Sequence, residues 1–207
     1  MDGAILTGGR SSRMGADKAL LPLGGVALAL RVAGNMAAAG VCSRLFLAGG
    51  DQSRYGFLGL PVVPDVAGGQ GPLSGINAAL QAATEDWCAV AACDLPFLPP
   101  AFFALLAQVA AEGGADAIVP LVGGYRQTAA AAYAKSALPL LEEALGAGRL
   151  KMADLLSRLR VRYLTPSDLA SCGDLAWIFC NVNTPDDLEQ AENHLRAEAE
   201  EWRDVDR

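Results

Sequence analysis

Short apolar runs alternate along this chain with segments of helical character, and this alternation limits its possible folds more than any other feature. The runs at residues 4–7, 44–48 and 87–92 are almost uninterrupted by polar side chains, whereas residues 26–39 and 100–112 have the length and composition of helices. Strands that are apolar on both faces lie in sheets covered by helices on both sides. Strands that alternate with helices form parallel β-α-β units. The sequence therefore predicts an α/β fold with three layers and a mostly parallel central sheet.

The other expected elements continue this pattern to the end of the chain. Ser74 is expected to cap one helix, and Thr184 is expected to cap a last helix that Pro185 begins. The sequence has no internal repeat, low-complexity segment or long linker, so residues 1–207 are expected to form one domain. Further strands are expected at residues 60–63, 116–120, 128–133, 161–164 and 177–180, and further helices at residues 74–83, 138–145, 152–159 and 185–201.

Composition and charge exclude several classes of protein. Of the 207 residues, 52% are hydrophobic and 19% are charged, which excludes intrinsic disorder. No apolar run approaches the roughly 18 residues that a membrane span needs, and the N-terminus shows no signal-peptide pattern. The net charge is −7 without a basic patch, whereas nucleic-acid-binding proteins neutralise phosphates with one. We therefore expect a cytoplasmic protein with no nucleic-acid partner and no membrane association.

The cysteines and the single histidine narrow the chemistry. The five cysteines form no C-x-x-C pair, and most lie in apolar runs, where cysteine behaves as a small hydrophobic residue. With His194 as the only histidine, an ordinary zinc site is not expected. His194 lies in a polar helical pattern and is expected on the surface. The sequence therefore argues against a Cys-His or Ser-His-Asp hydrolase.

A glycine-rich segment with several cations follows the first expected strand directly. Gly8 and Gly9 allow the backbone to approach a ligand and to turn its N–H groups toward an anion. Arg13 and Lys18 add positive charge suited to phosphate oxygens. The spacing differs from the Walker loop and from the G-x-G-x-x-G fingerprint. We interpret the segment as a phosphate-binding loop rather than as a solvated glycine turn.

Polar residues also follow three other expected strands. In α/β sheets ligands bind beyond the carboxyl ends of the strands. Asp94 suits a Mg²⁺ ligand beside a bound triphosphate, although a helix-capping or turn aspartate explains it equally well. Asp65 precedes the glycine-rich residues 68–75, which suit either close approach to a nucleotide or a plain flexible loop. Asn181 and Asn183 lie on one side of an extended segment and have no structural explanation in the sequence.

These residues together resemble a known family. The run Leu6–Leu21 is similar to the signature loop of the molybdenum cofactor guanylyltransferases. Gly71–Gly75, Cys93–Pro96 and Asn181–Pro185 match the later motifs of that family in the same order, so the likeness covers nearly the whole chain, from residue 5 to about residue 188. It implies a Rossmann-like nucleotidyltransferase fold. It also implies transfer of GMP from GTP to molybdenum-molybdopterin, which forms a guanine dinucleotide and pyrophosphate.

The resemblance assigns roles to individual residues. Arg13, Lys18 and Asp94 would be the catalytic residues, with Lys18 stabilising charge on the phosphates and Asp94 binding Mg²⁺. Asn181 and Asn183 would lie toward the molybdopterin. The chain up to about residue 100 would then bind GTP, and the rest would face the pterin. By this resemblance the GTP-binding residues are Leu6, Thr7, Gly8, Gly9, Lys18, Asp65, Gly71 and Asp94.

The resemblance also implies partners and leaves rival functions open. Besides GTP and molybdopterin, transient contact with cofactor-carrying proteins or apo-molybdoenzymes is expected. The nearest rival is another nucleotidyltransferase, such as a molybdenum cofactor cytidylyltransferase or a sugar-1-phosphate enzyme. A different class of rival is a non-catalytic module that binds nucleotide or pterin. The family can present an asparagine after the second strand, but the chain has Ala48–Asp51 there, so that contact is not carried over.

Overall fold

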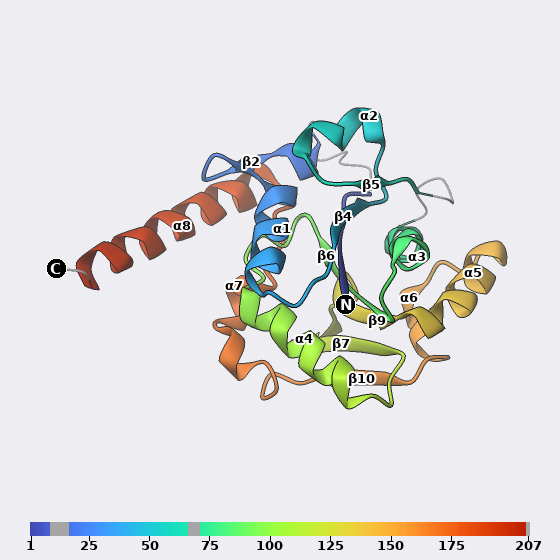
Figure 1. Ribbon diagram of the computed structural model, residues 1–207. Helices are drawn as coiled ribbons and strands as arrows, with labels where there is room; N and C mark the ends of the chain where they lie inside the picture. Colours follow the sequence, from blue (N-terminus) through green and yellow to red (C-terminus); the bar gives the residue numbers. More distant parts are fainter. Residues whose placement is uncertain (9–16, 66–70, 206–207) are drawn as a thin grey trace.

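The computed structural model of the protein describes residues 1–8, 17–65 and 71–205, and for 201–205 it describes the backbone alone. In this part of the chain one sheet has the strand order β10-β7-β9-β6-β1-β4-β5, with β8 paired to β7 (Figure 1). A separate hairpin joins β2 and β3. The strands are β1 Asp2–Leu6, β2 Pro22–Leu23, β3 Val26–Ala27, β4 Leu45–Ala48, β5 Val62–Val63, β6 Trp87–Ala92, β7 Ala117–Val122, β8 Tyr125–Arg126, β9 Ala130–Ala134 and β10 Val161–Leu164.

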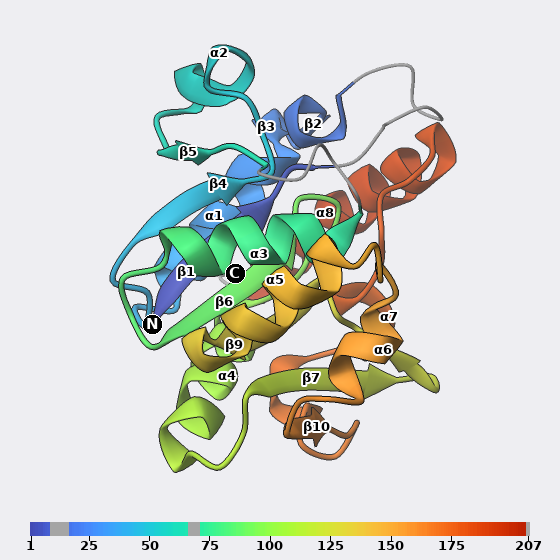
Figure 2. The same ribbon diagram turned by 90° about the vertical axis from the view of Figure 1, so that its right-hand side faces the viewer.

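The sheet is mostly parallel, as the sequence predicts. The pairs β1/β4, β1/β6, β4/β5 and β7/β10 are parallel, whereas β9 runs antiparallel to both β6 and β7. Because β9 opposes both neighbours, β7 points in the same direction as β6 and β1 (Figure 2). The segments that follow β1, β4, β6 and β7 therefore meet at one edge of the sheet, where α/β proteins bind ligands.

Helices cover both faces of the sheet, which completes the expected three layers (Figure 1). The core on one face packs α1 and α4 against the sheet, and the core on the other face packs α3, α5 and α6. The α-helices are α1 Leu28–Ala38, α2 Gln52–Tyr55, α3 Pro72–Ala82, α4 Pro100–Glu112, α5 Leu138–Gly146, α6 Met152–Leu156, α7 Leu175–Ile178 and α8 Pro185–Val205, and the 3₁₀ helices are η1 Lys18–Leu20, η2 Gly56–Leu58, η3 Lys135–Ala137 and η4 Ala170–Cys172.

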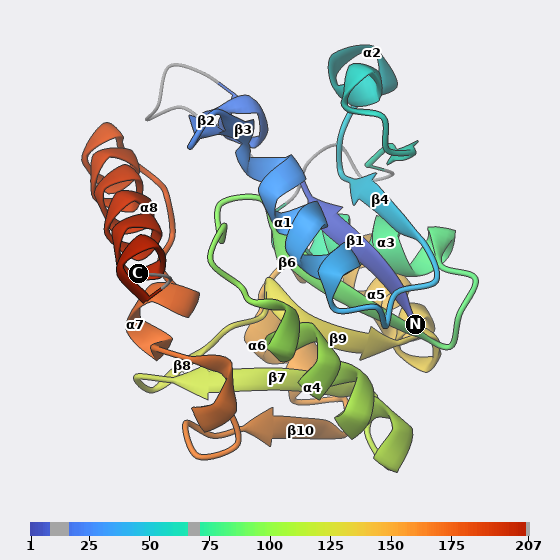
Figure 3. The ribbon, with the colours of Figure 1, turned by 60° about the vertical axis from the view of Figure 1, so that its left-hand side comes forward.

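The last helix, α8, stands apart from the three layers. Its first half packs on a small core that contains Leu23, Leu28, Val182 and Ala191, and the rest extends away from the sheet (Figures 1 and 3). The helix is amphipathic but largely charged on its outer side. None of the helices among the described residues is long and apolar enough to cross a membrane.

Most expected elements are present, but the strand predicted at residues 177–180 is wrong. The run Leu175–Ile178 forms the short helix α7 instead. Asp174 caps this helix by accepting a hydrogen bond from the backbone N–H of Ala176, and Gly173 turns the chain into it with a φ of +114°. A four-residue apolar run between turn residues suits a strand and a buried helix equally well, so periodicity alone cannot distinguish them.

Two helix starts also differ from the prediction. Helix α3 begins at Pro72 rather than at a Ser74 cap, because proline is favoured in the first turn of a helix. The first long helix begins at Leu28, since Val26 is paired in the β2–β3 hairpin. The predicted cap at Thr184 is confirmed, because its hydroxyl oxygen accepts a 3.2 Å hydrogen bond from the backbone N–H of Asp187.

Candidate functional site

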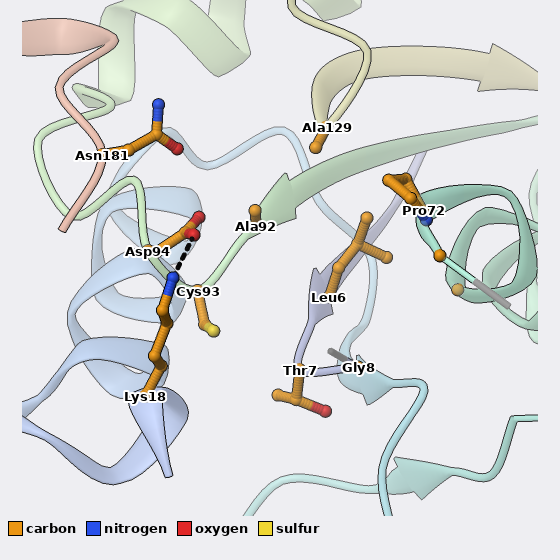
Figure 4. Close-up of a pocket in the computed structure, with 12 residues that line it drawn as sticks. Leu6, Thr7, Gly8, Lys18, Pro72, Ala92, Cys93, Asp94, Ala129 and Asn181 are labelled. Atoms are coloured by element: carbon orange, nitrogen blue, oxygen red, sulfur yellow. Dashed lines mark hydrogen bonds and ion pairs between the residues drawn. The ribbon is translucent and has the colours of Figure 1, made fainter. Parts of the chain in front are cut away.

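A cavity of about 260 Å³ opens at the carboxyl edge of the sheet, between the ends of β1 and β6 and the first turn of α3 (Figure 4). The sequence predicts a ligand site at this edge of the sheet. Its walls combine small residues, which leave room for a ligand, with a few polar groups, as ligand sites generally do. The lining residues are Leu6, Thr7, Gly8, Lys18, Gly71, Pro72, Gly75, Ala92, Cys93, Asp94, Ala129 and Asn181.

Three polar side chains from distant parts of the chain meet at one end of this cavity. The Nζ atom of Lys18 lies 3.3 Å from Oδ2 of Asp94 (Figure 4). It also donates a hydrogen bond to Oδ1 of Asn183. The side chains of Lys18 and Asp94 are 19% and 21% exposed. An ion pair that is largely shielded from water is screened less than a surface pair. We call this group of Lys18, Asp94 and Asn183 the charged junction.

Local structure holds Lys18 at the junction. Lys18 begins the 3₁₀ helix η1, which Asp17 caps by accepting a 3.1 Å hydrogen bond from the backbone N–H of Ala19. Asp17 is held in turn by an ion pair with Arg54 of α2, with 2.5 Å between Nε and Oδ2. The short helix α2 thereby ties the segment that carries Lys18 to the end of β4.

The segment that carries Asn183 is fixed to the segment that carries Asp94 through the backbone. The N–H of Val182 donates a 2.9 Å hydrogen bond to the carbonyl oxygen of Asp94. Asp187, in the first turn of α8, accepts hydrogen bonds of 2.8 Å from the backbone N–H groups of Asn183 and Thr184. Together with the Thr184 cap these bonds form a reciprocal box at the start of α8. The carboxylate of Asp187 therefore orients the turn that carries Asn183.

We expect Asp187→Asn to lower stability at neutral pH but not in strong acid. The backbone N–H of Asn183, and then the hydroxyl and N–H of Thr184, lower the pKa of Asp187 below its ordinary value of 3.8. A lowered pKa in the folded state means that the carboxylate stabilises the fold fully above the ordinary pKa, and that this stabilisation disappears as the pH falls through the folded pKa. Urea unfolding of both proteins between pH 7 and pH 2 measures the difference.

The matched control is Asp186→Asn, because Asp186 is the exposed neighbour on the same helix turn. Its stability difference from wild type should stay small across the same pH range. A constant difference between wild type and Asp187→Asn down to pH 2 would contradict the assigned role of the carboxylate.

Glycine backbones pack against one another on the opposite wall of the cavity. Gly8 follows β1, and Gly49 follows β4 with a φ of +85°. A Cβ atom on Gly49 would lie 3.2 Å from the backbone nitrogen of Gly8 and 3.8 Å from Cα of Gly75. A Cβ atom on Gly8 would lie 3.1 Å from the carbonyl oxygen of Gly49. Side chains at these positions would push the two loops apart, so the chain uses glycine at both strand ends.

We expect Gly49→Ala to destabilise the protein by about 2 kcal/mol, because it combines a left-handed φ with a tight backbone contact. Gly59→Ala is the matched control, since Gly59 has a similar φ of +77° but nothing within 4 Å of the added Cβ. Urea midpoints give both values. If the two variants lose the same stability, the contact between Gly8 and Gly49 is not what requires glycine.

The first turn of α3 closes the cavity on the nucleotide side of the predicted site. Gly71 precedes the helix with a φ of +77°, and Pro72 lines the cavity. Ser74, also in this first turn, donates its hydroxyl hydrogen to Oδ1 of Asp65, so Ser74 orients this carboxylate rather than capping α3. The N-terminus of α3 carries the positive end of the helix dipole, which favours an anion.

The Cys93 thiol, which lies in the cavity wall, is not suited to nucleophilic attack. Burial raises the pKa of the Cys93 thiol well above its ordinary range, so the sulfur is neutral near pH 7. Neutral thiols are poor nucleophiles. The charged groups that face the cavity among the described residues are Lys18 and Asp94. This arrangement suits positioning and charge stabilisation rather than covalent catalysis.

The structure brings most of the predicted site residues together. Asn183 does not line the cavity but contacts Lys18, which does. Asp65 does not line it either, and its carboxylate accepts a hydrogen bond from the Ser74 hydroxyl in the first turn of α3. Gly9 and Arg13 lie outside the described residues. The predicted residues that line the cavity directly are Leu6, Thr7, Gly8, Lys18, Gly71, Asp94 and Asn181.

Sequence reasoning missed several contributors to the site and misjudged one residue. Ala92 and Ala129 line the cavity, but small apolar residues at strand ends carry no signal of their own. Gly49 was identifiable only as part of a glycine pair after a strand. His194 was expected on the surface, but its side chain is only 20% exposed because it packs against aromatic rings.

The chain is similar in sequence to known proteins over most of its length. The model of the MobA-like NTP transferase domain family matches residues 3–162. The "Probable molybdenum cofactor guanylyltransferase" of Pelotomaculum thermopropionicum is 41% identical over 91% of this chain and 90% of its own length. The "Molybdenum cofactor guanylyltransferase" of Rhodobacter capsulatus is 36% identical over 95% of this chain and 97% of its own length.

Solved structures show the same fold. The crystal structure of "Molybdopterin-guanine dinucleotide biosynthesis protein A" from Archaeoglobus fulgidus has a TM-score of 0.83 at 31% identity, over 95% of this chain and all of the other. The 2-C-methyl-D-erythritol 4-phosphate cytidylyltransferase from Thermus thermophilus shares the fold with a TM-score of 0.65 at 18% identity, over 93% of this chain and 98% of the other.

The fold and the charged cavity at the strand ends are therefore those of a nucleotidyltransferase. Within this class the chain belongs to the family of the molybdenum cofactor guanylyltransferases.

Proposed function

We propose that this protein transfers GMP from GTP to molybdenum-molybdopterin and releases pyrophosphate. The observation that carries the proposal is the charged junction. Its members Lys18 and Asp94 line the cavity, and Lys18 also contacts Asn183. The family relationship supplies the identity of the substrates. The geometry supplies a place where a phosphate would meet a fixed cation.

The two substrates would occupy different walls. The chain up to about residue 100 supplies Gly8, the first turn of α3 and Lys18. GTP would bind there through Leu6, Thr7 and Gly8. The sequence leads us to expect that Gly9 and Arg13 assist. The later part supplies Asn181, Asn183 and Ala129, and the molybdopterin would face it.

The reaction requires no nucleophile from the protein. An oxygen of the terminal phosphate of the pterin would form a bond to the α-phosphorus of GTP, while the bond between the α-phosphorus and the bridging oxygen breaks and pyrophosphate departs with the electron pair. Lys18 would stabilise the charge that builds up on the α-phosphate and on the leaving group. The two walls would hold the substrates in line, which lowers the entropic part of the barrier.

Mg²⁺ suits the residues present at the junction. Asp94 supplies a carboxylate that borders the cavity, and Asn181 supplies a carboxamide oxygen on the same wall. Mg²⁺ prefers such hard oxygen ligands and is commonly held by one or two carboxylates together with substrate phosphates. When bound, the ion would neutralise charge on the phosphates of GTP. Asp94 would be its protein ligand, and Lys18 would keep the carboxylate in place.

The proposal also covers the protein partners and the cellular location of the reaction. Transient contact with cofactor-carrying proteins or apo-molybdoenzymes is part of the proposal. The reaction is proposed to take place in the cytoplasm, without nucleic acid or a membrane as partner.

The first experiment is calorimetric titration of the protein with GTP, CTP and ATP, each with Mg²⁺, followed by a transfer assay with molybdopterin. Preference for GTP and formation of the guanine dinucleotide are expected. Preference for CTP with a cytosine product would overturn the assignment of the base. Nucleotide binding without any transfer would instead indicate a non-catalytic module. Lys151→Met, which changes an exposed lysine far from the cavity, is the control for nonspecific charge effects.

A further inference from the structure

Three rings from three different segments form a compact cluster behind the charged junction. The indole of Trp177 in α7 stacks on the imidazole of His194 in α8, with centroids 3.7 Å apart and planes 4° from parallel. Phe97 places its ring edge-on against both, with centroid distances of 5.7 Å to Trp177 and 5.2 Å to His194. His194 Nε2 also lies 3.3 Å from Oε1 of Glu198. We call Phe97, Trp177 and His194 the aromatic cluster.

The cluster connects the chain segments that carry two members of the charged junction. Phe97 comes three residues after Asp94, and Trp177 comes six residues before Asn183. The two segments also meet at the hydrogen bond from the N–H of Val182 to the carbonyl oxygen of Asp94. A single backbone bond leaves two segments free to rotate about it, whereas a second, broad contact restricts that rotation. The ring contacts supply this second connection.

Helix α8 also reaches the third segment, which carries Lys18. Glu192, two residues before His194, accepts a 2.7 Å hydrogen bond from the backbone N–H of Gly24 in the β2–β3 hairpin. Leu23 of the same hairpin packs in one core with Ala191 of α8, and Phe97 and Leu195 pack against this core. Figure 3 shows the first half of α8 beside the β2–β3 hairpin. One helix therefore contacts all three segments that meet at the junction.

We propose that Trp177 and His194 are positioning residues for the transfer reaction. Their stacking holds α7 against α8, and this packing fixes the positions of Asn183 and Asp94 around the Lys18 amine. Neither residue lines the cavity in which we propose that GTP binds. Displacement of reacting groups by about 1 Å can slow a reaction about 100-fold. Loss of the stack should therefore slow the chemical step more than it weakens GTP binding. This inference rests on the proposed function.

The first test compares His194→Ala and Trp177→Leu with the conservative variant Trp177→Phe, which keeps an aromatic face. The control is Asn193→Ala, an exposed neighbour of His194 on α8. We expect His194→Ala and Trp177→Leu to lower kcat about tenfold, with KM for GTP within about twofold of wild type. Trp177→Phe should recover most of the rate, and Asn193→Ala should match wild type. A kcat for His194→Ala within twofold of wild type in a folded protein would overturn the proposal.

A second test does not depend on catalysis and shows whether the cluster and the junction act on each other. Urea midpoints are measured for His194→Ala, Lys18→Met and the double variant. If the cluster positions the junction, the double variant loses less stability than the sum of the two single losses, because coupled residues are not additive. Strict additivity would overturn the coupling. If wild type itself transfers no GMP, the proposed function fails, and the urea cycle still decides the coupling.

Discussion

Lys18→Met is expected to lower kcat for GMP transfer by about 100- to 1,000-fold, which is the usual loss when one group that stabilises transition-state charge is removed. The amine lies between Asp94 and Asn183 at the edge of the cavity, where a phosphate would approach. Methionine keeps the length of the side chain without the charge. Because the interaction is strongest with charge that develops during transfer, KM for GTP should change much less than kcat.

Folding should not account for this loss. Lys18 and Asp94 are each about one-fifth exposed, so water from the cavity can solvate the remaining carboxylate. The expected cost in unfolding free energy is about 1 kcal/mol or less. Lys151→Met is the matched control, since it removes the same charge from an exposed position. A Lys18→Met variant that is folded and retains more than a tenth of the wild-type kcat would exclude Lys18 from charge stabilisation.

Asp94→Asn is expected to have an effect of similar size through the metal. The substitution preserves the shape of the side chain and its contact with Lys18 but removes the negative charge that Mg²⁺ would require. We expect transfer to fall by about 1,000-fold and the dependence of the rate on Mg²⁺ concentration to shift to higher values. Rates measured across a series of Mg²⁺ concentrations separate the two effects.

Asp86→Asn provides the control for this experiment. Asp86 is exposed and precedes β6, whereas Asp94 follows the same strand at the opposite end. The control should show wild-type rates and wild-type Mg²⁺ dependence. If Asp94→Asn shows an unchanged Mg²⁺ dependence, the ion is held by other groups and the metal role of Asp94 is wrong.

Much of the fold was predictable because it depends on local composition. Residues 87–92 form a strand with the predicted bounds, since a continuous apolar run bounded by polar residues is typical of a buried strand. The shorter strand at residues 161–164 also has its predicted bounds. Pro100–Glu112 also has its predicted bounds, because proline marks its start and Gly113 its end. The error at residues 177–180 arose where the run was too short for periodicity to distinguish a helix from a strand.

The candidate site was predictable to the extent that its residues follow strands. In a parallel sheet the ends of strands converge on one edge, so Gly8, Asp94 and the glycines before α3 had to be near one another. The resemblance to a known family added the roles of the individual residues. Residues whose contribution is only their small size, such as Ala129, carried no signal in the sequence.

By itself, the sequence thus determined the class of fold, the order of most strands and helices along the chain, and several of the residues that line the cavity. These features depend on local propensity and on the direction of parallel strands. Only the tertiary structure decided which side chains touch. Lys18 meets Asp94 across 76 residues and Asn183 across 165 residues. Such contacts are set by the packing of whole elements, here α8 against the hairpin and α7, and no local pattern encodes that packing.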